Sequence, residues 1–313
     1  YGHRPSQGTF GIRAAKVIAP GDPYRSVLLY RMAKLGRGRM PHFGSGVVDR
    51  MGLRLIHDWI DSLDRGPTAN PTVESARRQL LKIRFATMMN PPLRENGIRR
   101  LVTPMLSSTE GALVLATQLG REGFNAKVNR WIIDFASGHP DPQIRDLFEP
   151  FLPEEKRTKR LGTTVDAVAL LKLKGDVARG RALFLRTAGV SCINCHKIQG
   201  RGKDVGPDLS HIAKKNTRAQ LLESIPQPSK TIDRKYLVYL VETKKGRVFS
   251  GLLKQRDAKQ VVLTDPQGKA IRIPAGDVEL IVPQRKSLMP ELLFRDMTAR
   301  QLADLLQFLQ SLK

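Results

Sequence analysis

The segment Cys192-Ile193-Asn194-Cys195-His196 holds the residues best suited to chemistry in this chain. Its pattern, C-x-x-C-H, is typical of sites at which haem is attached through two thioether bonds. Two cysteines three residues apart on a helical turn can each bond one vinyl group, and the next imidazole can then bind the iron. The chain has 313 residues and only two cysteines, and both lie in this segment. The sequence therefore predicts one covalent haem c, bound by Cys192, Cys195 and His196.

Two other uses of a C-x-x-C pair compete with haem attachment. A zinc site of this kind needs a second pair of ligands at similar spacing, and the sequence has none. A thioredoxin-like redox pair is expected within a βαβ unit, which the flanking residues do not indicate. Haem attachment is the favoured interpretation.

Short helices and turns must position this segment. Residues 175–184 predict a helix, in which Gly180 lowers helix propensity unless another backbone has to approach it closely. Residues 206–209 predict a turn, and residues 217–220 predict a capping box that opens a second helix. Residues 298–301 predict another capping box. It is followed by leucines that give the last helix one apolar face, at positions 302, 305, 306, 309 and 312.

The iron needs a sixth ligand, and Met289 lies in a Met-Pro loop before the last predicted helix. A thioether there would keep the haem low-spin and raise its reduction potential. A lone methionine more often packs in a core, but the place between a loop and a capped helix favours the ligand role. The competing residue is His211, which we expect at the start of a helix, facing solvent. The predicted iron ligands are therefore His196 and Met289.

Taken together, these features resemble class I cytochrome c. They are more similar still to the haem-binding C-terminal domain known from planctomycete and verrucomicrobial genomes. The resemblance covers residues 175–313 and is carried by the strings GDVARGRALF, CINCH, GPDLSHI, LLESIPQPSKTID, SLMP and LADLLQFLQSL. It implies a mainly α, class I cytochrome c-like fold. It also implies that the Pro207 carbonyl accepts the Nδ1 proton of His196, so that the other ring nitrogen faces the iron.

Within residues 175–313 the pattern changes from helical to alternating at about 232–283. This change predicts five strands, inserted between the two iron ligands and separated by turn residues. The strands are expected at 236–242, 247–254, 260–264, 270–273 and 278–282. We expect a small β-barrel of SH3 or Sm-like type, which favours a packing or docking role over ligand binding.

Residues 1–65 repeat the C-terminal layout. Placing Met40-Pro41 on Met289-Pro290 aligns the apolar residues of the two following segments without a gap. The repeat predicts a partial cytochrome c-like tail that lacks a C-x-x-C-H. That motif would lie upstream of this chain, or the tail is a relic that has lost its haem. An unrelated helix after a Met-Pro turn is the alternative, because short apolar patterns recur by chance.

Residues 66–174 predict an α-helical connector without a catalytic constellation. Its helical stretches are expected at 73–89, 111–119, 125–136 and 143–148. Three nearby carboxylates, Asp141, Asp146 and Glu149, are expected on a solvated face beside Arg145.

The composition limits the class of protein and its partners. The length allows two or three domains, and the sequence contains no run of eighteen apolar residues that predicts a membrane span. Fifty-three basic and 29 acidic residues give a net charge of +24, which would attract acidic redox partners, anionic envelope polymers or nucleic acid. Because the basic residues are scattered and aromatic residues make up 6%, the sequence disfavours nucleic-acid binding.

The predicted function is electron transfer by a c-type cytochrome, a carrier rather than an enzyme. Covalent haem attachment takes place outside the cytoplasm, so we expect an extracytoplasmic protein whose signal peptide is not in this chain. The partner would be an acidic redox protein, or an upstream or partner cytochrome or dehydrogenase domain. One alternative is the electron-accepting module of a larger dehydrogenase whose catalytic domain lies outside this chain. Another is a basic polyanion-binding protein with a structural haem; a peroxidase is disfavoured, since a methionine ligand closes the iron to peroxide.

Overall fold

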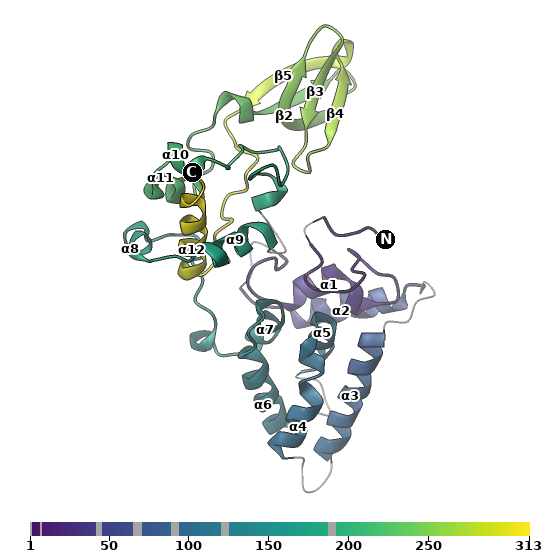
Figure 1. Cartoon of the computed structure of the whole chain (residues 1–313). Helices are drawn as coiled ribbons and strands as arrows, with labels where there is room; N and C mark the ends of the chain where they lie inside the picture. The colour runs from purple at the N-terminus through teal and green to yellow at the C-terminus, as the bar shows by residue number, and fades with distance from the viewer. Residues whose placement is uncertain are drawn as a thin grey trace. The chain divides into compact units, whose positions relative to one another are not determined.

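The computed structural model describes residues 2–6, 8–41, 46–64, 71–88, 94–119, 125–186 and 192–313. The chain forms two compact units, Tyr1–Thr158 and Lys159–Lys313 (Figure 1). Within the described residues, no helix is both long and apolar enough to cross a membrane.

The first unit is helical. Its central helix is α5, which is buried along nearly its whole length and contacts α1, α3 and α7 (Figure 1). The helices are α1 (Val27–Ala33), α2 (Arg50–Ser62), α3 (Pro71–Met88), α4 (Glu95–Val102), α5 (Thr109–Gln118), α6 (Ala126–Ser137) and α7 (Pro142–Phe148). All four helical stretches predicted for the connector are present. Unit 1 thus joins these connector helices and the predicted N-terminal tail in one body.

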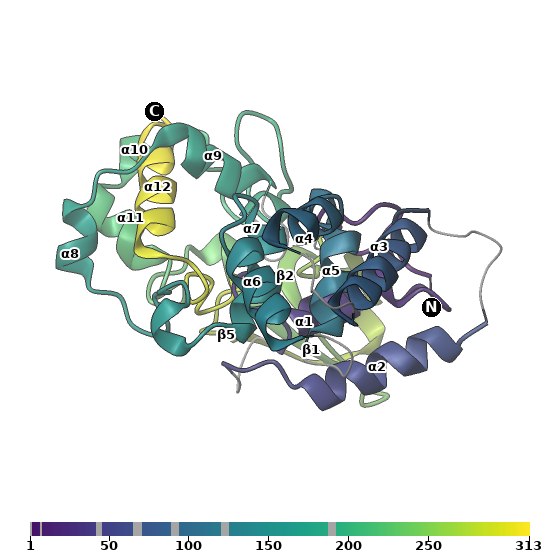
Figure 2. The same cartoon turned by 90° about the horizontal axis from the view of Figure 1, so that it is seen from below.

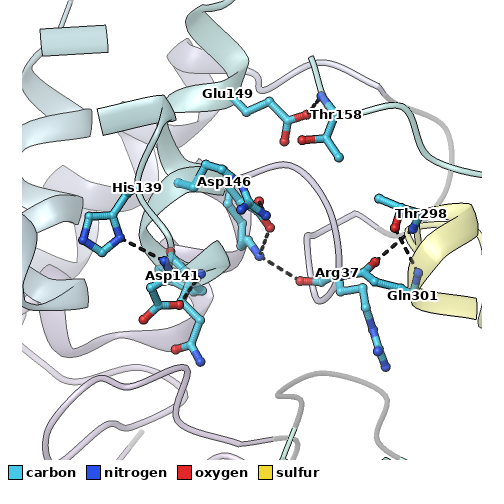
Figure 3. Close-up of polar contacts among 12 residues, drawn as sticks. Arg37, His139, Asp141, Asp146, Glu149, Thr158, Thr298 and Gln301 are labelled. Atoms are coloured by element: carbon cyan, nitrogen blue, oxygen red, sulfur yellow. Dashed lines mark hydrogen bonds and ion pairs between the residues drawn. The ribbon is translucent and has the colours of Figure 1, made fainter. Parts of the chain in front are cut away.

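Charged side chains are buried beside α7 in unit 1. The Asp146 carboxylate is 5% exposed and lies 3.1 Å from the Nζ of Lys34. The buried Glu149 carboxylate accepts a hydrogen bond of 2.6 Å from the amide of Thr158 (Figure 3). The expectation of a solvated face is therefore wrong for these two carboxylates, because a paired or hydrogen-bonded charge can be buried. The third, Asp141, is the N-cap of α7.

The second unit is built around a crossing of two helices, α9 (Val177–Arg186) and α12 (Ala299–Gln310). A Cβ atom added to Gly180 on α9 would collide with the carbonyl oxygen of Asp304 and lie 2.7 Å from the Cβ of Phe308. The predicted reason for a glycine in this helix, a close backbone approach, is thereby confirmed. The shorter helices are α8 (Ala167–Lys172), α10 (Ile212–Lys215) and α11 (Arg218–Ser224).

Both predicted capping boxes of unit 2 are present. Thr217 and Gln220 exchange hydrogen bonds at the start of α11, and Thr298 and Gln301 do so at the start of α12 (Figure 3). The apolar face of α12 packs into the largest core of the unit, which also includes Leu170 of α8. Unit 2 therefore begins before residue 175, because the residues around α8 share this core.

The insertion forms five antiparallel strands, as the alternation predicts. They are β1 (Val238–Thr243), β2 (Val248–Arg256), β3 (Gln260–Thr264), β4 (Ala270–Pro274) and β5 (Val278–Gln284). The structure does not show the expected closure into a barrel: the strands form an open sheet in the order β4-β3-β2-β1-β5. Closure would need hydrogen bonds between the edge strands β4 and β5, and in the described residues 192–313 these two strands pair only with β3 and β1.

Candidate functional site

The C-x-x-C-H segment forms a single tight turn. Residues Cys192–Asn194 are a 3₁₀ turn, and the amides of Cys195 and His196 both donate to the Cys192 carbonyl, at 3.1 and 2.9 Å. Both cysteine side chains are partly buried. A turn of this kind holds two sulfur atoms and one imidazole within five residues of one short segment, as attachment of a single flat ligand requires.

The orientation of the His196 ring is set by the turn that follows. Its Nδ1 atom lies 2.9 Å from the carbonyl oxygen of Pro207, the hydrogen bond that the resemblance implies. Because a carbonyl can only accept, Nδ1 is the donor and Nε2 has a free lone pair. Burial lowers the pKa of His196, although the Pro207 hydrogen bond acts in the opposite direction. A neutral imidazole with Nε2 available is the form that binds a metal.

Backbone hydrogen bonds tie this turn to the C-x-x-C-H segment. The amides of Val205 and Gly206 both donate to the carbonyl of Cys195, at 3.0 and 2.7 Å. A Cβ at position 206 would lie 2.6 Å from Cε1 of His196, so only glycine fits beside the ring. The turn thus holds the imidazole in place through two contacts: Gly206 lies against the ring, and the Pro207 carbonyl accepts the hydrogen bond from Nδ1.

Cys195 lacks the lowered pKa that is typical of a reactive redox thiol. Burial raises the pKa of the Cys195 thiol, and the charge of Lys203 only partly offsets this. Redox-active cysteines of C-x-x-C proteins instead have lowered pKa values. Within the described residues, no group of three or more His, Cys, Asp or Glu side chains could hold a metal ion.

Met289 and the attachment turn pack against the same hydrophobic core of unit 2. Its side chain is partly buried and packs against the main core, as do those of Cys192 and Leu209. Its amide donates to the hydroxyl of Ser287 at 3.1 Å, which fixes the backbone just before Pro290. The predicted competitor, His211, is exposed at the N-cap of α10, as expected.

The inserted sheet contacts both segments that carry predicted iron ligands. On one face of the sheet, Val238 and Leu252 form a buried cluster with Val205, and Cys195 and Leu288 pack against it. The other face forms a core of its own around Val241 and Leu263. Sequence reasoning missed the first contact, because an alternating pattern shows which residues share a face but not what covers that face.

Comparison with protein families identifies this part of the chain. The family model described as Cytochrome c matches residues 177–262. This segment is a cytochrome c domain. The match includes α9, the attachment turn, strands β1 and β2 and the first part of β3, and it ends before Met289. A comparison with curated protein sequences found no significant match.

The cytochrome c family implies a covalent haem c, and the residues present fit that group. The domain provides two cysteines on one turn and a neutral imidazole held through Nδ1. Apolar side chains that include Ile193 and Leu209 pack against the same core as Cys192. The thiols of Cys192 and Cys195 would hold the vinyl carbons of the haem, and Nε2 of His196 would bind its iron.

Proposed function

We propose that this chain is an extracytoplasmic c-type cytochrome that transfers electrons through one haem c, with His196 and Met289 as axial ligands. The observation that carries the proposal is the His196 imidazole, directed by Pro207 and adjoining two cysteines within a cytochrome c domain. When bound, haem c supplies an iron that cycles between the ferric and ferrous states.

The residues of this chain would attach the haem and would fix the proton and the orientation of its histidine ligand. The thioether bonds of Cys192 and Cys195 keep the haem attached, and the Pro207 carbonyl keeps the proton on Nδ1 of His196. The thioether of Met289 supports a low-spin iron with a raised potential, since a soft ligand favours the ferrous state.

The charge of the chain supports an acidic redox partner. A net charge of +24 steers acidic surfaces toward the protein before contact. Covalent haem attachment supports the proposed location, because that reaction takes place outside the cytoplasm.

A redox titration of the haem-loaded full chain tests this function. We expect a reversible spectral change that fits a single one-electron step, since the chain has one C-x-x-C-H segment. Two resolved steps, or an iron that cannot be cycled, would contradict the proposal. Expression with and without an export signal tests the location: we expect haem on the exported chain alone, and attachment in the cytoplasm would contradict it.

A further inference from the structure

Unit 2 contains a pocket between the C-terminal end of α12 and the link that joins α10 to α11. Figure 2 shows this end of α12 beside α10 and α11. The pocket has a volume of about 410 Å³, within the range of about 300–1,000 Å³ that is usual for small-molecule sites. Two hydrogen bonds join its walls. The amide of Ala213 donates to the Leu312 carbonyl at 3.0 Å, and Nη1 of Arg218 donates to Oε1 of Gln310 at 3.2 Å.

The pocket is strongly basic. Four cationic side chains line it, and among the described lining residues none is acidic; the cations are Lys214, Lys215, Arg218 and Lys313. Across the part of the chain that the structure describes, none of the four is paired with an acidic side chain. A cleft lined by charges of one sign focuses their field and concentrates ions of the opposite sign. The pocket should therefore attract an anion.

Arg218 is held at the pocket by neutral groups. Nη1 donates to the side-chain oxygens of Gln307 and Gln310, both at 3.2 Å, and Nη2 donates to the Leu173 carbonyl at 2.9 Å. The side chain is partly buried, and this burial lowers the pKa of Arg218. A partly desolvated charge is unfavourable until an opposite charge compensates it. The three contacts fix the guanidinium and leave some of its N–H groups for a ligand.

A simpler explanation accounts for only part of this cluster. Lys214 and Lys215 lie in the last turn of α10, where cations interact favourably with the carbonyl end of a helix. Arg218 belongs to α11, and Lys313 follows α12. Cations from different elements therefore meet at one pocket, which the end of α10 does not explain.

We propose that this pocket binds an oligophosphate, a ligand that carries several phosphate groups in a chain. Lys, Arg and Asn side chains bind phosphate oxygens in nucleic-acid complexes, and Asn216 lines the pocket together with the cations. Because the cations come from different elements, a chain of phosphates can meet several of them at once, whereas a single phosphate cannot. The described lining has no aromatic side chain on which a nucleobase could stack. The site therefore recognises the phosphate chain, and it does so independently of the electron transfer proposed above.

Calorimetric titration of the full chain with tripolyphosphate tests this site. We expect saturable binding of one tripolyphosphate per chain. The double variant Lys214→Gln, Lys215→Gln should weaken binding about tenfold or more, because charge-assisted hydrogen bonds to the ligand are lost. The matched control, Lys244→Gln with Lys245→Gln, removes the same charge from a lysine pair between β1 and β2 and should leave the affinity unchanged. All four lysines are exposed, so both variants should fold.

Other ligands separate the phosphate chain from its possible sources. A nucleoside triphosphate should bind about as tightly as tripolyphosphate, and inorganic phosphate should bind much more weakly. The proposal is overturned if tripolyphosphate does not bind. It is also overturned if the two double variants weaken binding equally, because the net charge of the chain and not the pocket would then attract the ligand. A single-stranded oligonucleotide that displaces tripolyphosphate at equal phosphate concentration would overturn it too, since the face would then bind nucleic acid.

Discussion

At the scale of single residues, the proposed haem site depends on two neighbours of His196 that have no redox chemistry. The Pro207 carbonyl fixes the proton on Nδ1, and Gly206 leaves room for the ring. The sequence was sufficient to predict the Pro207 contact, through the resemblance to class I cytochrome c. The close contact of Gly206 with the ring could not be predicted, because it depends on the path of the turn in three dimensions.

The role of Met289 can be tested directly. Met289→Ala should open the sixth coordination position, lower the reduction potential and let small exogenous ligands bind the iron. The measurement is the methionine-to-iron charge-transfer band of the ferric protein together with a redox titration. The controls are His211→Ala and Met51→Ala, which alter exposed side chains and should change neither. A band that persists in Met289→Ala would assign the ligand role to another methionine.

Asp304 links the two crossing helices through a buried carboxylate. Burial raises the pKa of Asp304, but hydrogen bonds from Arg179 and from the amide of Asp176, with the charges of Arg179 and Arg300, outweigh burial and lower it. A carboxylate whose folded-state pKa lies below the unfolded value, about 3.9, stabilises the fold above that pH. This stabilisation is lost as the pH falls through the folded-state pKa.

Asp304→Asn should therefore lower the free energy of unfolding at pH 7 by about 1–2 kcal/mol. The expected loss is small because Arg179 is 59% exposed, so water screens its charge. The difference between parent and variant should shrink below about pH 4. Denaturant unfolding at pH 7 and pH 3 measures both values, and a difference independent of pH would contradict this account.

At the scale of elements, the close α9–α12 crossing should reverse the usual effect of a glycine-to-alanine substitution on stability. Replacing an interior helix glycine by alanine normally stabilises a helix by up to about 1 kcal/mol. At Gly180 the added methyl group meets the backbone of Asp304, so Gly180→Ala should instead destabilise unit 2 by about 1–3 kcal/mol. Thermal unfolding followed by circular dichroism measures the sign. Arg181→Ala, at an exposed position of the same helix, is the control, and a stabilised Gly180→Ala would contradict the close crossing.

Only one face of the inserted sheet should affect the iron, namely the face that packs against the attachment turn and the Met289 loop. Leu252→Ala removes a buried side chain that packs with Val205 and Leu288, next to the attachment turn and the Met289 loop. It should cost about 2–4 kcal/mol in stability and also weaken the methionine-to-iron band. Ile273→Ala, in the core on the other face, should cost a similar amount and leave the band unchanged. Equal spectra for the two variants would mean that the sheet does not position the ligand loop.

The sequence predicts local elements well and their long-range partners poorly. The structure contains the five strands and both capping boxes, which depend on residues close in sequence. It also contains the close helix crossing at Gly180, which follows from a steric rule. Closure of the sheet depends on whether β4 and β5 pair. A pattern of neighbouring residues does not predict that pairing. The burial of Asp146 was missed for the same reason, because its partner Lys34 lies 112 residues away in the sequence.

At the scale of the whole molecule, the net charge of +24 should govern encounter with redox partners. Electron exchange should be faster with an acidic redox protein than with a basic one of similar potential. It should slow as ionic strength rises, because the Debye length is about 8 Å at physiological salt and shortens further above it. Stopped-flow kinetics over a salt series measures this, with a neutral small-molecule reductant as the control. Rates that do not change with salt would mean that the charge does not serve redox docking.

The central claim is that haem is covalently attached at Cys192 and Cys195. Acid-acetone extraction of the haem-loaded chain tests it most directly, because thioether bonds survive denaturation and coordination bonds do not. The account predicts that the haem absorbance remains with the precipitated protein. It also predicts that the Cys192→Ser, Cys195→Ser double variant, expressed in the same way, retains none. Complete removal of haem from the parent chain would contradict the account.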